Sequence, residues 1–265
     1  MRGYLYMISG LLLLALFASC QRDIDLTIDH PSSLLVIEGN ITNFPGVQTV
    51  SVSTTIPYNK ANIFPGVAGA FVTLTTAGRT YVMNESADSG KYVLPNFKGE
   101  EGQSYTLTVK IDSAEVYTAT SVMPKLVKMD SIGITTVAVG GKTLRTVSVY
   151  YRDPPAELNQ YQFILFVNGV QVKHIFTLDD SHTDGRIVNT SLYQNDIEIK
   201  PNDRVDVEMQ CIDANVYKYL YTLEQQSGTN PSNSATPTNP DSNLSNGVLG
   251  YFSAHTAERK TLIVP

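Results

Sequence analysis

The sequence is poor in the residues that bind metals and redox groups. Among its 265 residues there are four histidines and two cysteines, which leaves little room for a zinc or iron–sulfur site. Charge is also sparse: 19 basic and 25 acidic residues give a net charge of −6, and there is no run of lysine or arginine. Because nucleic-acid binding needs a dense basic face, the composition argues against a nucleic-acid partner.

Known catalytic motifs are absent from the sequence as well. It contains no Gly-x-Ser-x-Gly elbow, no His-Glu-x-x-His pair and no recognisable triad. Residues 139–143 end like a phosphate-binding loop, but Thr136 replaces the motif's first glycine and no helical pattern follows, so we expect a hairpin turn. Acidic residues far apart in sequence can meet in space, but nothing selects a pair. We therefore predict a non-enzymatic protein that uses no cofactor.

The apolar content is sufficient for a globular fold. Hydrophobic residues make up 42% of the chain and charged residues 17%, which excludes a disordered tail protein. A chain of this length forms one large domain or two ordinary ones.

The N-terminus resembles a secretory signal. Arg2 supplies one positive charge, an apolar stretch follows over 5–18, and Cys20 stands where that stretch ends. The stretch is too short to span a membrane as a helix. Residues 16–20 resemble a bacterial lipobox, in which a peptidase cuts before a cysteine that is then lipidated, although Phe17 replaces the usual leucine. The alternatives are an uncleaved anchor and an ordinary signal with an incidental cysteine.

We accordingly predict a lipoprotein signal peptide over 1–19 and a lipidated tether over 20–33. The lipobox implies a cysteine that carries several acyl chains, such as palmitate, and two or more chains give a stable membrane anchor. Gln21 directly after the cysteine, in place of aspartate, favours the outer membrane. Asp23 and Asp25 weakly resemble a surface-export tag, so the surface leaflet is slightly favoured over the periplasmic one.

From residue 34 onward the pattern is that of an all-β protein. Short alternating runs are separated by turn residues, and in 105–111 every second residue is apolar, as in a strand with one buried face. Seven such runs predict a small β-sandwich over 34–125. The runs are 34–42, 49–56, 70–76, 79–85, 91–94, 104–111 and 116–123.

The second half, over 126–265, is predicted to form a second β-sandwich-like domain. Its strands are expected at 129–139, 145–152, 161–167, 170–176, 187–193 and 204–212, with two short runs later at 248–252 and 261–264.

A hairpin is expected in the middle of this half. Asn168-Gly169 is the strongest short hairpin signal, because both residues tolerate positive φ in a type I′ turn. Such a turn sets the cross-strand pairs. These are Val167 with Val170, Leu165 with Val172, and Phe163 with His174. His174 is accordingly expected in the core or at a sheet edge.

One helix is predicted over 214–226, with Asp213 as its N-cap. The residues after it, 227–246, are almost wholly Ser, Thr, Asn, Pro and Gly and should form a long polar loop. Because Tyr251 and Phe252 follow closely, we expect this loop and the two rings to contact a partner or ligand. The alternative is a solvated loop that only connects.

A weak metal-binding pattern occurs in the second half. Residues 180–185 echo a calcium loop, with Asp180 and Asp184 as oxygen ligands and a glycine for the bend. The twelfth position is Ser191 and not the bidentate glutamate of such loops. A polar turn is therefore favoured, and we predict no metal.

Cys211 is expected to be a buried, inert thiol. It ends the run 205–211, in which apolar and polar residues alternate, so its side chain should point into the core. With Cys20 acylated it has no disulfide partner, and no histidine neighbours it. A nucleophilic role is disfavoured.

Several stretches together resemble a known family. The lipobox is followed by 23–26, 35–42, 67–74, 102–109, 123–124, 129–132 and 245–254. On these stretches the chain resembles the Bacteroidota lipoprotein family called domain of unknown function 4249, over nearly the whole mature chain. The resemblance implies an N-terminal half similar to Ig-like or carboxypeptidase-regulatory-like modules. It also implies an outer-membrane lipoprotein, often encoded beside a TonB-dependent transporter, and it names no catalytic residue.

Two serines match a modification sequon of exported Bacteroidota proteins. Ser113 and Ser131 each follow an aspartate and precede a small or apolar residue. Three-residue motifs arise easily by chance, so the two serines are candidates for O-glycosylation only.

From these features together we expect an outer-membrane-anchored binding component that assists a TonB-dependent transporter in nutrient uptake. The alternative is a structural or adhesive cell-surface lipoprotein without a transport role. A degradative enzyme is the least favoured reading, because no motif supports it.

Overall fold

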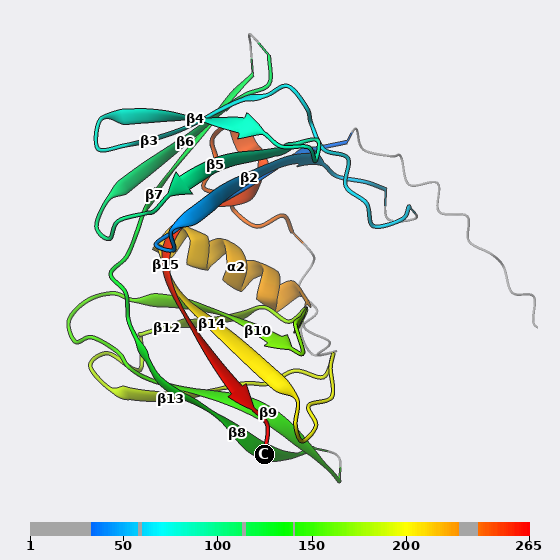
Figure 1. Ribbon diagram of the computed structural model, residues 1–265, viewed down its shortest axis with the longest axis vertical. Coiled ribbons are helices and arrows are strands. Elements are labelled where there is room, and N and C mark those ends of the chain that lie inside the picture. The colour runs from blue at the N-terminus through cyan, green and yellow to red at the C-terminus, as the bar shows by residue number, and fades with distance from the viewer. Residues whose placement is uncertain (1–32, 58–59, 113–114, 140, 228–237) are drawn as a thin grey trace, which may run out of the picture. The chain divides into compact units, whose positions relative to one another are not determined.

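The computed structural model describes residues 33–57, 60–112, 115–139, 141–227 and 238–265. In these ranges the protein is mainly β with one α-helix, as the sequence predicts (Figure 1). Residues 33–265 form one compact unit, and within it the hydrophobic side chains gather into two large cores. The predicted division into two domains at residue 125 stays a prediction. No helix in the described part of the chain has the length and hydropathy to cross a bilayer.

The strands of the first half surround the first core. They are β1 (Leu35–Thr42), β2 (Gly46–Thr54), β3 (Phe71–Thr76), β4 (Arg79–Glu85), β5 (Lys91–Phe97), β6 (Ser104–Lys110) and β7 (Val116–Val122). Along β6, Tyr105, Leu107 and Val109 are buried, whereas the residues between them are not. This alternation confirms the predicted strand with one buried face, and burial of the apolar rows supplies most of the driving force for the sandwich.

Tyr105 fastens β6 to the turn that precedes it. Its hydroxyl accepts a hydrogen bond from the Glu100 amide at 2.7 Å and donates one to the Glu100 carbonyl at 3.3 Å. A tyrosine that bonds to backbone a few residues upstream is a recurrent feature of Ig-like sandwiches. Burial raises the pKa of this phenol, so the hydroxyl keeps the proton that it donates.

The second half adds the remaining elements. They are β8 (Met129–Val139), β9 (Lys142–Arg152), β10 (Gln160–Val167), β11 (Val170–Gln171), β12 (Phe176–Asp179), β13 (Ile187–Leu192), β14 (Arg204–Ile212), α2 (Ala214–Ser227), the short 3₁₀ turn η1 (Ser245–Gly247) and β15 (Leu249–Ile263). The second core lies between β9 on one side and β10 and β14 on the other. Tyr151, Tyr161 and Cys211 are among its buried members.

One strand joins the two halves. The large sheet runs in the order β11-β10-β14-β15-β1-β2-β5-β4-β3-β6-β7, and β13-β9-β8 form a separate three-stranded sheet. In the large sheet β15 pairs in parallel with β1, where Ile37 lies opposite Gly250. Further along, β15 pairs antiparallel with β14, where Cys211 lies opposite Thr256. The strand therefore passes from the first core to the second (Figure 1).

The length of β15 differs from the prediction. Two short strands, at 248–252 and 261–264, were expected, and the structure has one continuous strand over Leu249–Ile263. The residues between the two expected runs, 253–260, are mostly small or polar and show no apolar alternation. They are extended because β1 provides backbone partners up to His255 and β14 provides them from Thr256 onward, which side-chain patterning does not reveal.

The Asn168-Gly169 turn has the predicted conformation. Both residues have positive φ, 51° and 81°, as a type I′ turn requires. Val167 pairs with Val170, and the Val172 amide donates to the Leu165 carbonyl at 2.8 Å. The first two predicted pairs are thus confirmed.

The third predicted pair is wrong. Phe163 lies opposite Phe176 and not opposite His174, because two additional residues leave the ladder before β12 begins. The amide of Lys173 donates to the Asp196 carboxylate at 2.7 Å, so this segment is held away from the ladder. His174 is half-buried, and its ring lies 4.6 Å from that of Phe176.

The helix α2 begins as predicted. Asp213 Oδ1 accepts hydrogen bonds from the amides of Asn215 and Val216, at 2.9 and 3.1 Å, which satisfies two of the free amides of the first turn. The helix buries Val216 and Leu220 against the end of β14 and contacts β10, β12 and β15.

His255 lies at the point where β15 leaves the first core. Its side chain is 1% exposed, Nδ1 lies 2.9 Å from the Ser253 hydroxyl, and Nε2 has no partner among the described residues. Burial lowers the pKa of His255 from 6.5 to about 4, although the charge of Glu208 acts in the opposite direction. The imidazole is therefore neutral at pH 7.

Exchange of Gly250 for alanine should destabilise the protein by about 3 kcal/mol. Gly250 has φ of 98°, and an added Cβ would lie 2.0 Å from the Ile37 carbonyl oxygen in β1. The measurement is urea unfolding of Gly250→Ala beside Gly133→Ala. Gly133 is the matched control because its added Cβ would meet only Tyr150, at 3.6 Å. Equal stability of the two variants would contradict the close approach of β1 and β15.

The stability of the protein should fall between pH 7 and pH 5 in a manner that depends on His255. Unfolded histidine takes up a proton near pH 6.5, whereas folded His255 takes one up only near pH 4, so acid favours the unfolded chain in this interval. The expected contribution is about 2 kcal/mol. His255→Gln should remove it, and His182→Gln, which changes an exposed imidazole, should not. An unaltered pH profile of unfolding in His255→Gln would show that His255 does not cause the dependence.

Candidate functional site

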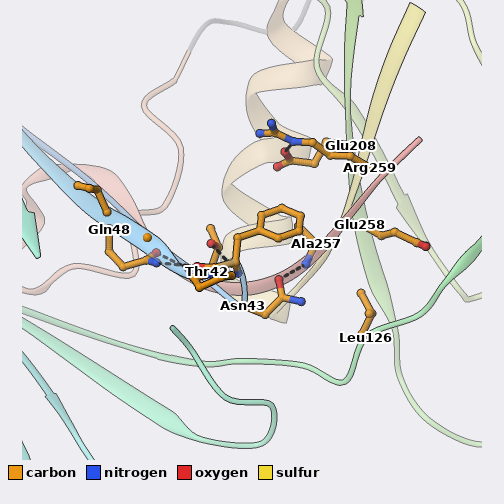
Figure 2. Close-up of a pocket in the computed structure, with 12 residues that line it drawn as sticks. Thr42, Asn43, Gln48, Leu126, Glu208, Ala257, Glu258 and Arg259 are labelled. Carbon is orange, nitrogen blue, oxygen red and sulfur yellow. Dashed lines mark hydrogen bonds and ion pairs between the residues drawn. The ribbon is translucent and has the colours of Figure 1, made fainter. Parts of the chain in front are cut away.

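A groove of about 740 Å³ lies beside the strand that joins the two cores (Figure 2). Its walls come from the β1–β2 hairpin, the linker before β8, β14 and the second half of β15. The lining residues are Thr42, Asn43, Phe44, Pro45, Gly46, Val47, Gln48, Leu126, Glu208, Ala257, Glu258 and Arg259.

Gln48 holds the hairpin wall of the groove in shape. Its buried side chain accepts a hydrogen bond from the Thr42 amide at 2.8 Å and donates to the carbonyls of Phe44 and Phe97, at 3.1 and 2.9 Å. All three bonds reach backbone groups at the turn or at the adjacent register shift between β2 and β5. One side chain thus replaces the hydrogen bonds that the turn interrupts.

Two side chains connect the walls to the second half of the molecule. Asn43 Oδ1 accepts a hydrogen bond from the Ala257 amide at 2.8 Å, so the hairpin is joined to β15. Glu258 Oε2 accepts from the Met129 amide at 2.6 Å, so β15 is joined to the start of β8. Figure 2 shows the bond between Asn43 and Ala257. These bonds make the groove a preformed feature of the fold.

An ion pair lies in the wall of the groove. The Arg259 guanidinium donates through Nε to Glu208 Oε2, and Gln210 Nε2 donates to Glu208 Oε1 at 2.5 Å. The Glu208 side chain is buried, whereas that of Arg259 is mostly exposed. The guanidinium also lies over the Phe44 ring, 5.7 Å from its centre, which is within the range of a cation–π contact.

The groove combines an apolar rim with one cationic group. Phe44, Pro45 and Val47 are exposed on the hairpin, and the terminal nitrogens of Arg259 have no hydrogen-bond partner among the described residues. A guanidinium presents planar donors that suit carboxylates and carbonyl oxygens. The arrangement is therefore suited to an extended segment with apolar side chains and an acceptor group.

A serine–histidine pair occurs near the groove but is closed to solvent. Ser253 and His255 are each 1% exposed, and their side chains contact one another as described above. A nucleophile must reach its substrate, and neither side chain lines the groove. The pair accordingly acts within the structure of β15.

The two acidic residues of the calcium-like stretch meet a third. A carboxylate oxygen from each of Asp153, Asp180 and Asp184 lies within 4.8 Å of the other two. Asp153 follows β9, far from the others in sequence, and sequence reasoning did not select it. The one available signal was its position directly after a strand, where loop residues that bind ligands commonly occur.

The residues predicted for partner contact lie in different environments. Phe252 is 0% exposed within the first core, so its ring is not exposed for the contact that the sequence predicts. Tyr251 is half-buried, with its ring 5.2 Å from that of Tyr219 in α2. Residues 228–237 of the predicted loop lie outside the described residues, and Leu244 near its end is buried in the first core.

Of the remaining predicted sites, some lie outside the described residues and others lie within them. Cys20 and Ser113 lie outside the described residues, and Ser131 is exposed on β8. Cys211 is a buried free thiol, as predicted, and burial raises its pKa. The phosphate-loop-like stretch forms the hairpin between β8 and β9, in which Val139 pairs with Lys142.

Comparisons with known proteins concern the family and the fold. No curated protein matches the chain. Among solved structures it is similar to a two-domain fibronectin type-III segment of chicken tenascin, with 16% identity, a TM-score of 0.23, and coverage of 68% of this chain and 91% of that chain. It is also similar to the chicken CNTN1 FN1–FN3 domains, with 12% identity, a TM-score of 0.28, and coverage of 67% and 60% respectively.

Both matches are to fibronectin type-III, Ig-like domains. A family model described as "Domain of unknown function (DUF4249)" matches residues 21–261. Because this match spans nearly all of the chain, the protein belongs to the DUF4249 family.

Proposed function

We propose that this protein is a lipid-anchored outer-membrane component that binds a partner or ligand without catalysing a reaction. The observation that carries the proposal is the preformed groove with its apolar rim and Arg259. Binding sites are characteristically concave and largely apolar with a few placed polar groups. The groove has that composition.

The partner that we propose is a TonB-dependent transporter, for which the protein acts as an accessory in nutrient uptake. Two observations support this choice. The N-terminal pattern that ends at Cys20 resembles a lipobox, and lipidation would hold the protein at the membrane that contains such transporters. The chain also belongs to the DUF4249 family, whose resemblance is the basis on which we propose a Bacteroidota lipoprotein.

Further parts of the proposal concern the anchor and the modules. We assign the lipid anchor to Cys20, at the outer membrane, with the surface leaflet slightly favoured. The first sandwich is proposed to be of the Ig-like or carboxypeptidase-regulatory-like type. The closed position of the Ser253–His255 pair supports a non-enzymatic role. The alternative function is a structural or adhesive surface lipoprotein.

Replacement of Cys20 by alanine should abolish incorporation of labelled palmitate and release the protein from the membrane fraction. The reason is that acylation at this thiol would supply the apolar surface that holds the chain in the bilayer. Cys211→Ala is the matched control, because the Cys211 thiol is buried in the second core. Undiminished label in Cys20→Ala would refute the anchor.

Introduction of a charge on the rim should weaken recovery of the partner. In a pull-down from membranes in mild detergent, Val47→Asp should retain at most about one tenth of the transporter that the unchanged protein recovers, because a rim carboxylate must be desolvated on binding. Val170→Asp is the matched control: Val47 and Val170 are both 60% exposed, but Val170 lies on β11 outside the groove.

The outcomes of this pull-down separate the two proposals. Equal recovery by Val47→Asp and Val170→Asp would show that the groove is not the contact site. Failure of the unchanged protein to recover any barrel transporter would contradict the transporter as partner and favour the adhesive alternative.

A further inference from the structure

We propose that Asp153, Asp180 and Asp184 form a binding site for a divalent cation of the calcium type. One carboxylate oxygen of each lies within 4.8 Å of the others. Two oxygens on opposite sides of a Ca²⁺ ion, each at about 2.3–2.6 Å, are about 5 Å apart, so three oxygens at these separations fit around one ion. Mg²⁺ binds oxygens at about 2.0–2.1 Å in a strict octahedron and keeps several waters, whereas Ca²⁺ accepts irregular sets of carboxylates, so the proposed ion is Ca²⁺.

The negative charge of this site is not balanced within the described residues. Asp153 is 0% exposed and Asp180 is 4% exposed, and no lysine or arginine of the described ranges forms an ion pair with any of the three carboxylates. Buried charges in proteins are ordinarily paired or coordinate a metal. A dication would offset both the repulsion between the carboxylates and their loss of hydration.

Backbone amides hold two of the carboxylates in position. The Asn159 amide donates to Asp180 Oδ2 at 2.9 Å, and the Ala156 amide donates to Asp184 Oδ1 at 2.7 Å. The other oxygen of each carboxylate, Asp180 Oδ1 and Asp184 Oδ2, has no hydrogen bond within the described residues. Each side chain is thus oriented by one oxygen and presents the second.

Asp153 is held by a tyrosine from the facing strand. The Tyr161 hydroxyl donates to Asp153 Oδ1, and the Gly185 amide donates to Oδ2 at 3.3 Å. The loop after β9 and the loop after β12 are further joined by the bond from the Asp153 amide to the Arg186 carbonyl, at 2.9 Å. Elements far apart in sequence therefore fix the geometry of the site.

Buried hydroxyl groups beside the carboxylates are the independent sign of a ligand. Tyr151 precedes Asp153 by two residues, on the same side of the chain, and its ring lies 5.0 Å from that of Tyr161. The side chain is 0% exposed, and its hydroxyl has no partner among the described residues. The Tyr161 hydroxyl donates to Asp153 Oδ1, so Tyr151 packs directly beside the side chain that holds this carboxylate.

A second hydroxyl without a partner belongs to the loop itself. Thr183 Oγ1, between Asp180 and Asp184 in sequence, is shielded from solvent and has no hydrogen bond among the described residues. Buried polar groups are nearly always satisfied by protein, water or ions. A bound cation with its waters would supply partners for both hydroxyls.

The test uses the full chain after removal of metal with EGTA. Addition of 2 mM CaCl₂ should raise Tm by about 5 °C, for a dissociation constant near 10⁻⁴ M. The same concentration of MgCl₂ should have a smaller effect. Absence of a Tm shift in CaCl₂ would overturn the proposal.

The variant Asp184→Asn distinguishes a metal site from a general effect of salt. Its amide oxygen can still accept from the Ala156 amide, so the fold should survive. In EGTA the variant should melt above the unchanged protein, because one repulsive charge is removed, and in CaCl₂ it should melt below it. Asp130→Asn, which neutralises an exposed aspartate on β8, should keep the full calcium shift. An equal calcium shift in Asp184→Asn would contradict the site.

Terbium luminescence provides a readout that does not depend on stability. The chain has no tryptophan, so excitation of tyrosine should sensitise Tb³⁺ emission through Tyr151 and Tyr161. The emission should be displaced by Ca²⁺ and reduced at least tenfold in Asp184→Asn. Emission that persists at full intensity in this variant would place the ion elsewhere and overturn the assignment.

Discussion

The backbone hydrogen bonds of β15 join the whole molecule. The first part of the strand pairs with β1, and the later part pairs with β14, so each large core depends on the same segment. The approach to β1 is close enough that only glycine fits opposite Ile37, at Gly250. At the transition the Ser121 hydroxyl accepts from the Ala254 amide and donates to Asp213, the cap of α2. A displacement of β15 would therefore disturb both cores and the start of the helix.

The same constraint explains why the groove is preformed. Its walls are the hairpin after β1, the linker before β8 and the strands β14 and β15. The hairpin, the start of β8 and β14 are each hydrogen-bonded to β15. Gln48 and Asn43 use their side chains on backbone groups, so the wall loses little conformational freedom when a ligand binds. The rim side chains Phe44, Pro45 and Val47 remain exposed, so they are free to contact a ligand.

Much of the fold follows from the sequence, and the failures have a common cause. Strands such as β6 and β14 are evident because one face is apolar, and Asn168-Gly169 indicates its turn by its tolerance of positive φ. The middle of β15 was not predicted because its polar residues are extended only through backbone pairing, first with β1 and then with β14. The register after Val172 was missed because Asp196, distant in sequence, takes the amide of Lys173.

The candidate sites, like the fold, could be predicted only where the residues concerned are close together in sequence. Asp180 and Asp184 could be found from local spacing, but Asp153 joins them only through the packing of two loops. Likewise, the charge of Glu208 on an alternating strand does not reveal its pair with Arg259, which lies on a neighbouring strand. Residues that meet only in the folded protein can be predicted only when the order of the strands in the sheet is known. In this sheet the C-terminal strand β15 lies between β14 and β1.

The parallel pairing of β1 with β15 has a consequence for the order of folding. Asn40 and Tyr251 share a hydrogen bond across 211 positions of the chain, and the first core is completed by Leu244, Phe252 and Ala254. During synthesis the ribosome releases these residues long after β1 to β7 have emerged. The first half must therefore wait, incompletely packed, until nearly the whole chain exists, and folding should be slow because most pairings are non-local.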